Sequence, residues 1–152
     1  MIVREYGPAD HDACAALFQE LLDTHRRLYP DTRIEGVFDP DGRLFVAEDD
    51  GSIVGYAGLV WHGRRAEIEP IVVARGMCGR GAGRALAQRV VEEARARGGL
   101  RIFVTPAARN RDAIVFFHEF GFDVIGSVQL QIDLEPRRRR PGAELAGRRF
   151  KV

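Results

Sequence analysis

The first part of the chain changes from strand-like to helix-like spacing of its apolar residues. Apolar and polar residues alternate over residues 2–6, which predicts a short strand. Over residues 14–22 the apolar positions recur at intervals of three and four, which predicts an amphipathic helix. Asp10 can cap this helix, and Pro30 ends it. A further short helix is expected within residues 32–38.

The middle of the chain contains apolar runs separated by turn residues. Residues 43–48 and 53–61 flank the sequence Asp49-Asp50-Gly51, which is typical of a β-hairpin. The turn His62-Gly63-Arg64 leads into a third apolar run, residues 66–73. We therefore expect three consecutive strands.

Glycines interrupt this pattern at Gly76, Gly79, Gly81 and Gly83, before helical spacing begins at Arg84. A strand, a glycine-rich turn and a helix start bring backbone N–H groups together at the positive end of a helix dipole, a geometry that binds phosphate. The turn lacks both the Gly-Lys-Ser/Thr of the Walker loop and the third glycine of the dinucleotide-binding fingerprint. It is therefore a phosphate site of another kind or a surface turn before a helix.

The second half of the chain continues the alternation of helices and strands. A helix is expected over residues 84–97, and a buried strand over residues 100–104. Asn110 or Asp112 then caps a helix that Gly121 ends. The apolar side chains of this helix that face the core are Ala113, Phe116, Phe117 and Phe120.

Two last strands are expected over residues 122–127 and 128–134. The whole order of elements predicts an α+β fold with a mixed central sheet. We expect a single domain over residues 1–134, with helices on both faces of the sheet. Residues 135–152 are a basic extension, rich in proline and arginine, outside the core pattern.

Two stretches resemble one enzyme family. Residues 72–86 read Val-Val-x4-Cys-Gly-Arg-Gly-Ala-Gly-Arg-Ala-Leu, which is similar to the pyrophosphate loop of the GNAT superfamily of acyl-CoA-dependent N-acetyltransferases. Gly81 and Gly83 match the last two fixed positions of its Gln/Arg-x-x-Gly-x-Gly/Ala motif, whereas Cys78 stands where Gln or Arg is usual. Residues 110–122 resemble the family's Asn-x-x-Ala-x-x-x-Tyr-x-x-x-Gly-Phe segment, with Phe117 in place of the tyrosine.

The resemblance implies acetyl-CoA as co-substrate. Four histidines at unrelated spacing predict no metal site. The resemblance also places backbone N–H groups of the glycine loop around the pyrophosphate, Val72 and Val73 along the pantetheine, and Asn110 near the CoA arm. A packing role is preferred for Phe117 over contact with the cofactor. The expected cofactor-binding residues are Val72, Val73, Met77, Cys78, Gly79, Arg80, Gly81, Ala82, Gly83, Arg84, Asn110 and Phe117.

The implied reaction is acetyl transfer to a primary amine of a small molecule or peptide. An amine of pKa near about 10 is protonated at neutral pH, so a base must remove its proton, usually through water. Some family members keep a glutamate on the strand before the loop, which favours Glu67 as base and Glu69 as the second choice. Both are expected on one face of that strand.

Phe117 cannot protonate the leaving thiolate as the family's tyrosine does. Three side chains near the expected acceptor side are open as substitutes, or have structural roles instead: His25, Tyr29 and Tyr56. Phe117 and Cys78 both differ from the family motifs. These differences suggest a second hypothesis, that the chain is a catalytically degenerate acyl-CoA-binding module. A binder of another phosphate ligand is a third.

Composition and charge limit the kinds of partner that the protein is expected to bind. A chain of 152 residues fits one domain, and two cysteines do not make a disulfide framework. No apolar run reaches membrane-span length and no signal peptide is apparent, so we expect a cytoplasmic protein. Residues 135–152 carry a formal charge of +5, so the chain total of +1 leaves −4 on residues 1–134. We therefore expect neither a nucleic-acid nor a membrane partner. The charge run and prolines of the extension suit a mobile tail, or an arm that packs on a second subunit of a homodimer.

Overall fold

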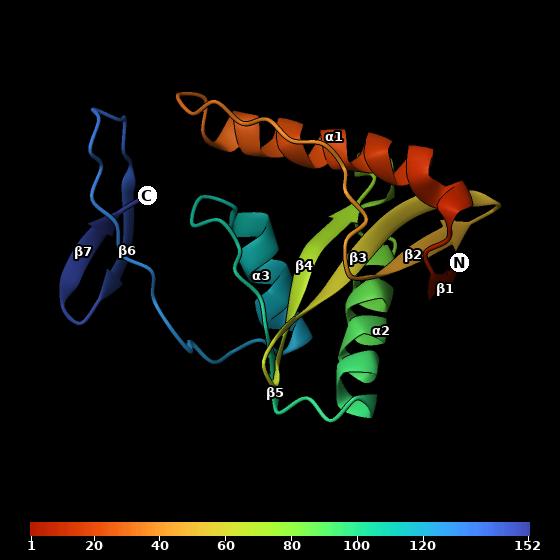
Figure 1. The fold of residues 1–152 in the computed structure, drawn as a ribbon. Coiled ribbons are helices and arrows are strands. Elements are labelled where there is room, and N and C mark those ends of the chain that lie inside the picture. Colours follow the sequence, from red (N-terminus) through yellow and green to blue (C-terminus); the bar gives the residue numbers. More distant parts are fainter.

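A five-stranded sheet forms the centre of the molecule in the computed structural model, which describes residues 1–152 (Figure 1). Its strands lie in sequence order: β1 (Ile2–Glu5), β2 (Arg43–Asp49), β3 (Ser52–His62), β4 (Arg65–Val73) and β5 (Arg101–Phe103). β1 to β4 pair antiparallel, and β5 pairs parallel to β4. The sheet is therefore mixed, as the order of elements predicts.

Helices cover both faces of the sheet. The long helix α1 (His11–Leu28) lies across one face, and α2 (Ala82–Ala96) and α3 (Arg111–Phe120) share the other (Figure 1). Two short 3₁₀ turns, η1 (Pro8–Asp10) and η2 (Arg75–Met77), precede α1 and α2. The predicted α+β class is confirmed.

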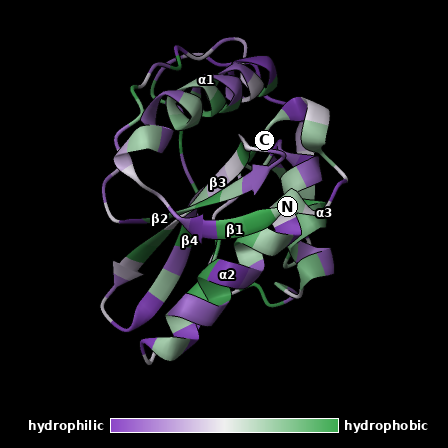
Figure 2. Ribbon diagram, turned by 90° about the vertical axis from the view of Figure 1, so that its right-hand side faces the viewer, coloured by the Kyte–Doolittle hydropathy of each residue, from purple (hydrophilic) through white to green (hydrophobic).

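Alternation along the central strands separates the two cores. On β2, Phe45 packs in the core beneath α2 and Val46 packs in the core beneath α1. On β3, Tyr56 belongs to the α1 side and Ala57 to the α2 side. Each helix packs its apolar side against these strands and turns its polar side to solvent. For this reason α1 and α2 show both hydrophobic and hydrophilic positions in Figure 2.

The helix caps are partly as predicted. Asn110 caps α3, because its Oδ1 accepts the N–H of Ala113 at 3.1 Å. Asp10 lies at the N-cap position of α1, but its side chain does not cap the helix. Its carboxylate instead accepts two bonds from the Arg4 guanidinium, at 2.7 and 2.8 Å, and one from the Gly7 N–H at 2.8 Å. The Arg4 bonds lower the pKa of Asp10 and tie β1 to the start of α1.

The short helix expected within residues 32–38 does not form. The segment is an irregular loop, held by the single buried side chain of Phe38. The Phe38 ring packs against Tyr56, Tyr6 and Phe18, with centroids 5.4, 6.2 and 6.3 Å away. One buried apolar anchor does not provide the continuous apolar face that a helix needs.

The end of the chain also differs from expectation. Residues 122–127 and 128–134 form no strands, and β5 is an exposed edge rather than a buried strand. A hairpin of β6 (Pro141–Leu145) and β7 (Arg148–Lys151) forms instead, within the predicted extension. Alternation alone does not make a strand, because the backbone also needs a hydrogen-bonding partner.

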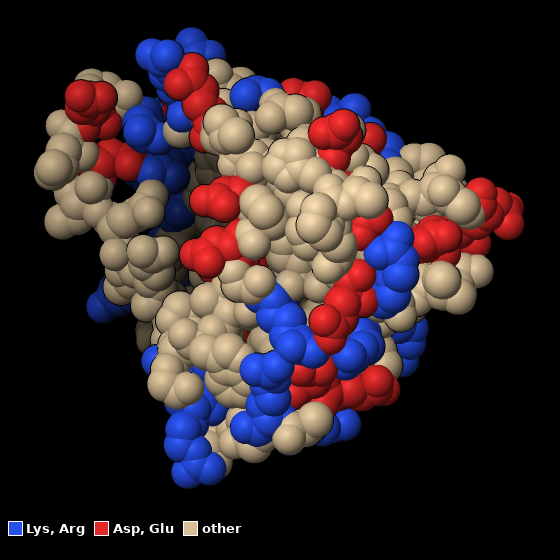
Figure 3. Space-filling model, turned by 45° about the vertical axis from the view of Figure 1, so that its right-hand side comes forward, with Lys and Arg blue, Asp and Glu red and all other residues tan.

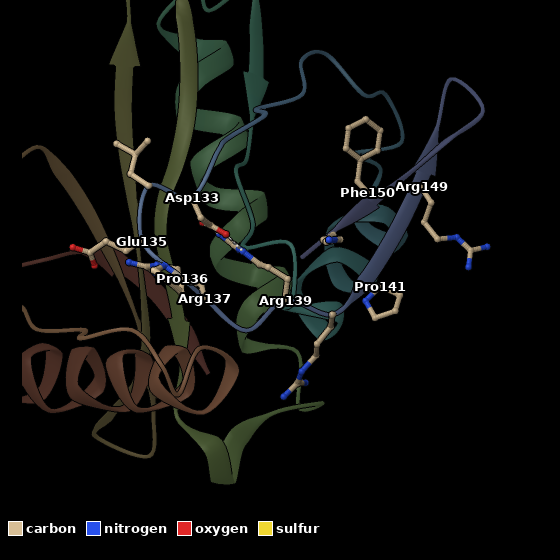
Figure 4. A pocket seen from close by; sticks show the side chains of 11 residues that line it. Asp133, Glu135, Pro136, Arg137, Arg139, Pro141, Arg149 and Phe150 are labelled. Carbon is tan, nitrogen blue, oxygen red and sulfur yellow. Dashed lines mark hydrogen bonds and ion pairs between the residues drawn. The ribbon is translucent and has the colours of Figure 1, made fainter.

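Contacts at the end of α1 hold this hairpin. The Arg109 guanidinium donates to the carbonyl oxygens of Leu28, Arg138 and Val152 at 2.8 to 3.0 Å. The N–H of Arg138 donates to Asp31, and the Arg137 guanidinium donates to Thr32. A pocket of about 950 Å³ lies between the hairpin and the chain that leads to it; only residues 133–151 line it, and an Arg139–Asp133 pair crosses it (Figure 4).

Candidate active site

A bulge in β4 shapes the candidate site. Ala57 of β3 pairs with Ile71 and Leu59 pairs with Ile68, so Gly58 faces the two residues Glu69 and Pro70. A Cβ on Gly58 would lie 2.1 Å from the carbonyl oxygen of Glu69. Only glycine allows this close approach, so the sequence of β3 fixes the bend in β4.

Beyond this point β4 and β5 separate. The three residues of β5 pair with Arg65, Ala66 and Glu67 of β4. Residues 68–73 of β4 have no strand beside them on that edge, over a length of about 20 Å. An unpaired strand edge presents backbone donors and acceptors, so it suits an extended ligand that carries amide groups.

The open edge leads into the glycine loop. Gly79 has φ +76° and Gly81 has φ +90°, a left-handed conformation that glycine adopts without strain. Gly81 is the N-cap residue of α2, and a Cβ on Gly79 or Gly81 would meet no atom within 4 Å. The loop therefore leaves open space at the start of the helix.

Some backbone N–H groups of the glycine loop donate hydrogen bonds within the loop, and others do not. The N–H groups of Met77, Cys78 and Arg80 donate to carbonyl oxygens within the loop. Those of Gly79, Gly81 and the first turn of α2, residues 82–84, make no such bonds. These free donors lie at the positive end of the α2 dipole, so they form the part of the loop that can bind an anion.

The side chains that the sequence analysis assigned to the cofactor site lie in and beside the glycine loop. Val72 is buried on the α1 side, and Val73 is partly buried on the α2 side. Arg84 lies 5.4 Å from the Phe120 ring centroid, and Arg80 Nη1 lies 3.1 Å from Met77 Sδ. The Cys78 thiol is exposed. Neither arginine has a carboxylate partner, so both remain able to pair with an anion.

Glu67 lies where β4 and β5 begin to separate. It is 7% exposed. Its Oε2 is 2.7 Å from His62 Nε2, and its Oε1 accepts the Thr105 hydroxyl at 3.0 Å. His62 comes from the end of β3 and Thr105 from the loop after β5, so three elements meet at one carboxylate.

Glu69 has a different environment from Glu67. It lies at the bulge and its side chain is exposed. The strict alternation expected along this strand would have placed both glutamates on one face in similar surroundings. The strand pairing is regular at Glu67 and the bulge begins at Glu69, so the structure holds Glu67, but not Glu69, in a defined position.

The remaining candidates have structural roles. Phe117 is buried in the α2-side core, 5.1 Å from the Phe116 ring and 5.4 Å from the Phe122 ring. Tyr56 is fully buried without a hydrogen-bond partner for its hydroxyl, and burial raises its pKa. The Tyr29 hydroxyl accepts the N–H of Arg109, and burial lowers the pKa of His25. None of these groups contacts Glu67.

His62 and Thr105 are site residues that the sequence analysis missed. His62 lies near Glu67 because the turn after β3 folds the two strands back on each other, a signal that was present in the sequence. Thr105 lies there because β5 pairs parallel with β4, which the linear pattern does not reveal. No group of three or more His, Cys, Asp or Glu side chains that could hold a metal is present.

Charges of both signs lie on the face of the molecule drawn in Figure 3. Acidic and basic side chains are interleaved on the face drawn in Figure 3. On α2, the Glu93 carboxylate pairs with three arginines, Arg43, Arg89 and Arg97. No helix is long and apolar enough to span a membrane.

A mixed sheet with helices on both faces, and a glycine-rich loop that joins its fourth strand to a helix, define an acetyltransferase fold. The chain belongs to the acetyltransferase (GNAT) family, whose model matches residues 10–122. The family suggested by the two sequence motifs is therefore confirmed.

Comparison with known proteins gives relatives of the same kind. An uncharacterised N-acetyltransferase of Mycobacterium bovis is 33% identical over 94 residues, which cover 61% of this chain and 60% of the relative. Streptothricin acetyltransferase of Streptomyces lavendulae is 36% identical over 92 residues, 58% of this chain and 48% of the relative. The chain thus matches about half to two thirds of the length of these relatives.

Among solved structures, aminoglycoside N-acetyltransferase AAC(6')-Iy in complex with CoA has the same fold. It superposes with a TM-score of 0.66 at 16% identity, over 87% of this chain and 98% of that one. At 16% identity, this similarity shows that the two proteins share a fold, and no more.

Proposed function

We propose that the protein transfers an acetyl group from acetyl-CoA to a primary amine of a small molecule or peptide, with Glu67 as the base. One observation carries the proposal: the open edge of β4 joins the glycine loop at one end to the buried Glu67 carboxylate at the other. A ligand with an anionic head and an amide-bearing arm that ends in a reactive group matches this arrangement.

The loop would hold the pyrophosphate of CoA. Its free N–H donors are those of Gly79, Gly81 and residues 82–84, and the empty space above Gly81 allows a phosphate to approach them. Arg80 and Arg84 supply charge. The amide groups of the pantetheine arm would pair with residues 68–73 of β4, beside Val72 and Val73.

Acetyl-CoA supplies an activated acyl group, and the protein supplies the base. Glu67 takes a proton from the amine through a water molecule, so that the nitrogen lone pair can attack the thioester carbonyl. A C–N bond forms, and a backbone N–H near Val72 or Val73 stabilises the oxyanion. The C–S bond then breaks and the new amide nitrogen releases its remaining extra proton to solvent, while CoA leaves as a thiolate that takes a proton from solvent.

His62 and Thr105 would position this base. An ionised carboxylate only accepts hydrogen bonds, so His62 Nε2 carries the proton in its contact with Glu67, and Thr105 donates to the other oxygen. His62 is half-exposed, whereas Glu67 is buried. The imidazole therefore contacts both the carboxylate and solvent.

The relatives suggest the acceptor class. Streptothricin acetyltransferase and aminoglycoside N-acetyltransferase are named for amine-bearing small molecules. The charge of −4 on residues 1–134 favours a cationic acceptor in the same way. We place the reaction in the cytoplasm, in keeping with two free thiols, Cys14 and Cys78.

The rival function is acyl-CoA binding without turnover. It is favoured by Phe117, which lies in the core and offers no proton to the leaving thiolate. An assay of thiol release from acetyl-CoA with a panel of amines separates the two. We expect release that depends on both acetyl-CoA and an amine, with a mass increase of one acetyl group on the amine. CoA binding without release for any amine would favour the rival.

A further inference from the structure

The hairpin of β6 and β7 and the chain that leads to it form a pocket with a basic lining. This basic pocket has a volume of about 950 Å³, and residues 133–151 alone line it. Its lining includes five basic side chains and two carboxylates, a formal charge of +3. Basic side chains are visible in the hollow beside the hairpin in Figure 3. The five basic residues are Arg137, Arg139, Arg140, Arg149 and Lys151.

Most of these cations have no carboxylate partner. Arg139 forms an ion pair with Asp133 across the pocket. The other four basic side chains are exposed and form no ion pair. Cations that share a pocket repel one another, so an anion that enters it is attracted by several charges at once. The basic pocket therefore has the charge to bind an anionic ligand.

Backbone contacts hold the pocket in place. The Arg109 guanidinium donates to the carbonyl oxygens of Arg138 and Val152, at 2.9 and 3.0 Å, and so ties both ends of the hairpin to the loop before α3. Arg140 and Val152 exchange two backbone hydrogen bonds, at 2.8 and 2.9 Å, which close the base of the hairpin. These bonds use backbone groups of the hairpin, so its cationic side chains stay available. A ligand would therefore meet a site whose backbone is already ordered, which lowers the entropic cost of binding.

The side chains of the pocket suit a single strand of nucleic acid. Arg149 and Lys151 are two residues apart on β7, so they lie about 7 Å apart on one face of the strand. Neighbouring phosphates of an extended nucleic-acid strand have a similar spacing. Phe150 also lines the pocket and is half-buried (Figure 4). Grooves that bind single strands combine cations for the phosphates with aromatic rings on which bases stack.

The same lining does not suit an acidic protein. Apart from two prolines, its only apolar side chains are Leu134 and Phe150. Stable protein interfaces depend on a cluster of buried apolar and aromatic anchors, surrounded by a polar rim. The basic pocket is nearly all rim, so its charge is better used on a phosphate backbone, where binding is driven by release of counterions.

We propose that the basic pocket binds single-stranded nucleic acid, with phosphates on its four unpaired cations and a base stacked on Phe150. The pocket shares no residue with the glycine loop or with the surroundings of Glu67, so this binding goes beyond acetyl transfer and does not depend on it. The expectation of no nucleic-acid partner rests on the acidic charge of residues 1–134. The hairpin is a separate basic surface, to which that argument does not apply.

Fluorescence anisotropy of a labelled oligouridylate RNA, titrated with the full chain, tests this proposal. Four phosphate contacts predict an affinity that falls about 50-fold as the salt concentration rises fourfold. Replacing both Arg149 and Lys151 by Gln should weaken binding about tenfold and halve the salt dependence. Replacing Arg64 and Arg95 by Gln is the matched control, because it removes the same charge from exposed positions outside the pocket, and it should change neither. Absence of binding at low salt, or an equal loss in the control, would overturn the proposal.

Competition experiments on the unaltered protein keep the test decisive if the variants misfold. Saturating CoA should leave the RNA bound, and displacement of the RNA by CoA would assign the binding to the glycine loop and refute the proposal. An oligo-glutamate of the same charge should compete at least about tenfold more weakly than unlabelled RNA, because it has no base to stack. Equal competition would show that only charge is recognised and would overturn the assignment to nucleic acid.

A variant of Phe150 tests the stacking separately from the charge. Phe150→Leu keeps an apolar side chain on β7 and removes the aromatic ring. It should weaken RNA binding about fivefold or more and leave the salt dependence unchanged, since no phosphate contact is lost. Parental affinity of this variant would refute the stacked base.

Discussion

The strands of the sheet and the segment after α3 contain similar alternation of apolar and polar residues, but only the strands have partners. On β2, Phe45 and Val46 are fully buried on opposite faces of the sheet. On the segment, Ile132 and Leu134 are exposed. The comparison teaches that alternation predicts a strand only where another backbone lies beside it. The side chains of the candidate active site all come from the part of the chain before this segment.

The largest expected effect is at the glycine loop. Gly81→Glu should abolish CoA binding, because a carboxylate would occupy the anion site and the left-handed backbone of Gly81 disfavours a side chain. Isothermal titration calorimetry with CoA measures this. Gly126→Glu, in the exposed segment, is a control that should bind normally. A folded Gly81→Glu protein with parental affinity would contradict the assignment of the loop.

The second effect concerns the positioning of Glu67. His62→Leu removes one of the two hydrogen bonds to the carboxylate and should lower kcat about tenfold, with KM for acetyl-CoA unchanged. His62→Gln keeps an N–H donor and should recover part of the loss. Steady-state kinetics of both variants checks this. If the leucine variant turns over as fast as the parent, His62 does not position the base.

Substitution of Asp10 should have a smaller effect, and it should change the free energy of unfolding. Asp10→Asn should lower the free energy of unfolding at pH 7 by about 1–3 kcal/mol, because the buried carboxylate accepts three hydrogen bonds. The pKa of Asp10 is lowered in the folded state, so its contribution is present above the unfolded value of about 4 and is lost as pH falls below it. Urea titrations should show the difference from the parent shrinking below about pH 4. A constant difference would argue against an ionised Asp10.

The smallest effect is expected at the end of the chain. A protein that ends at Glu135 loses the hairpin but none of the residues at the candidate site. It should fold and bind CoA with parental affinity, as measured by circular dichroism and calorimetry. Loss of solubility or structure would show that the fold needs the hairpin, and that the domain boundary at residue 134 is misplaced.

Local sequence signals predicted much of the fold and part of the site. Hairpin turns, the cap at Asn110 and the glycine loop depend on neighbouring residues, so they are visible in the sequence. The difference between Glu67 and Glu69 is not visible in the sequence, because Glu67 owes its position to side chains from other elements, His62 and Thr105, whereas Glu69 is exposed. Thr105 was missed for a similar reason: it reaches Glu67 through parallel pairing of distant residues.

The two glutamates of β4 provide the most direct test of the account. The central claim is that Glu67, held by His62 and Thr105, removes the proton of the amine. We predict that Glu67→Gln lowers kcat/KM by about 100-fold or more at pH 7 and that higher pH restores part of the activity as free amine accumulates. Glu69→Gln, on the same strand, should stay close to the parent. Equal activity of Glu67→Gln and the parent from about pH 6 to pH 9 would contradict the claim.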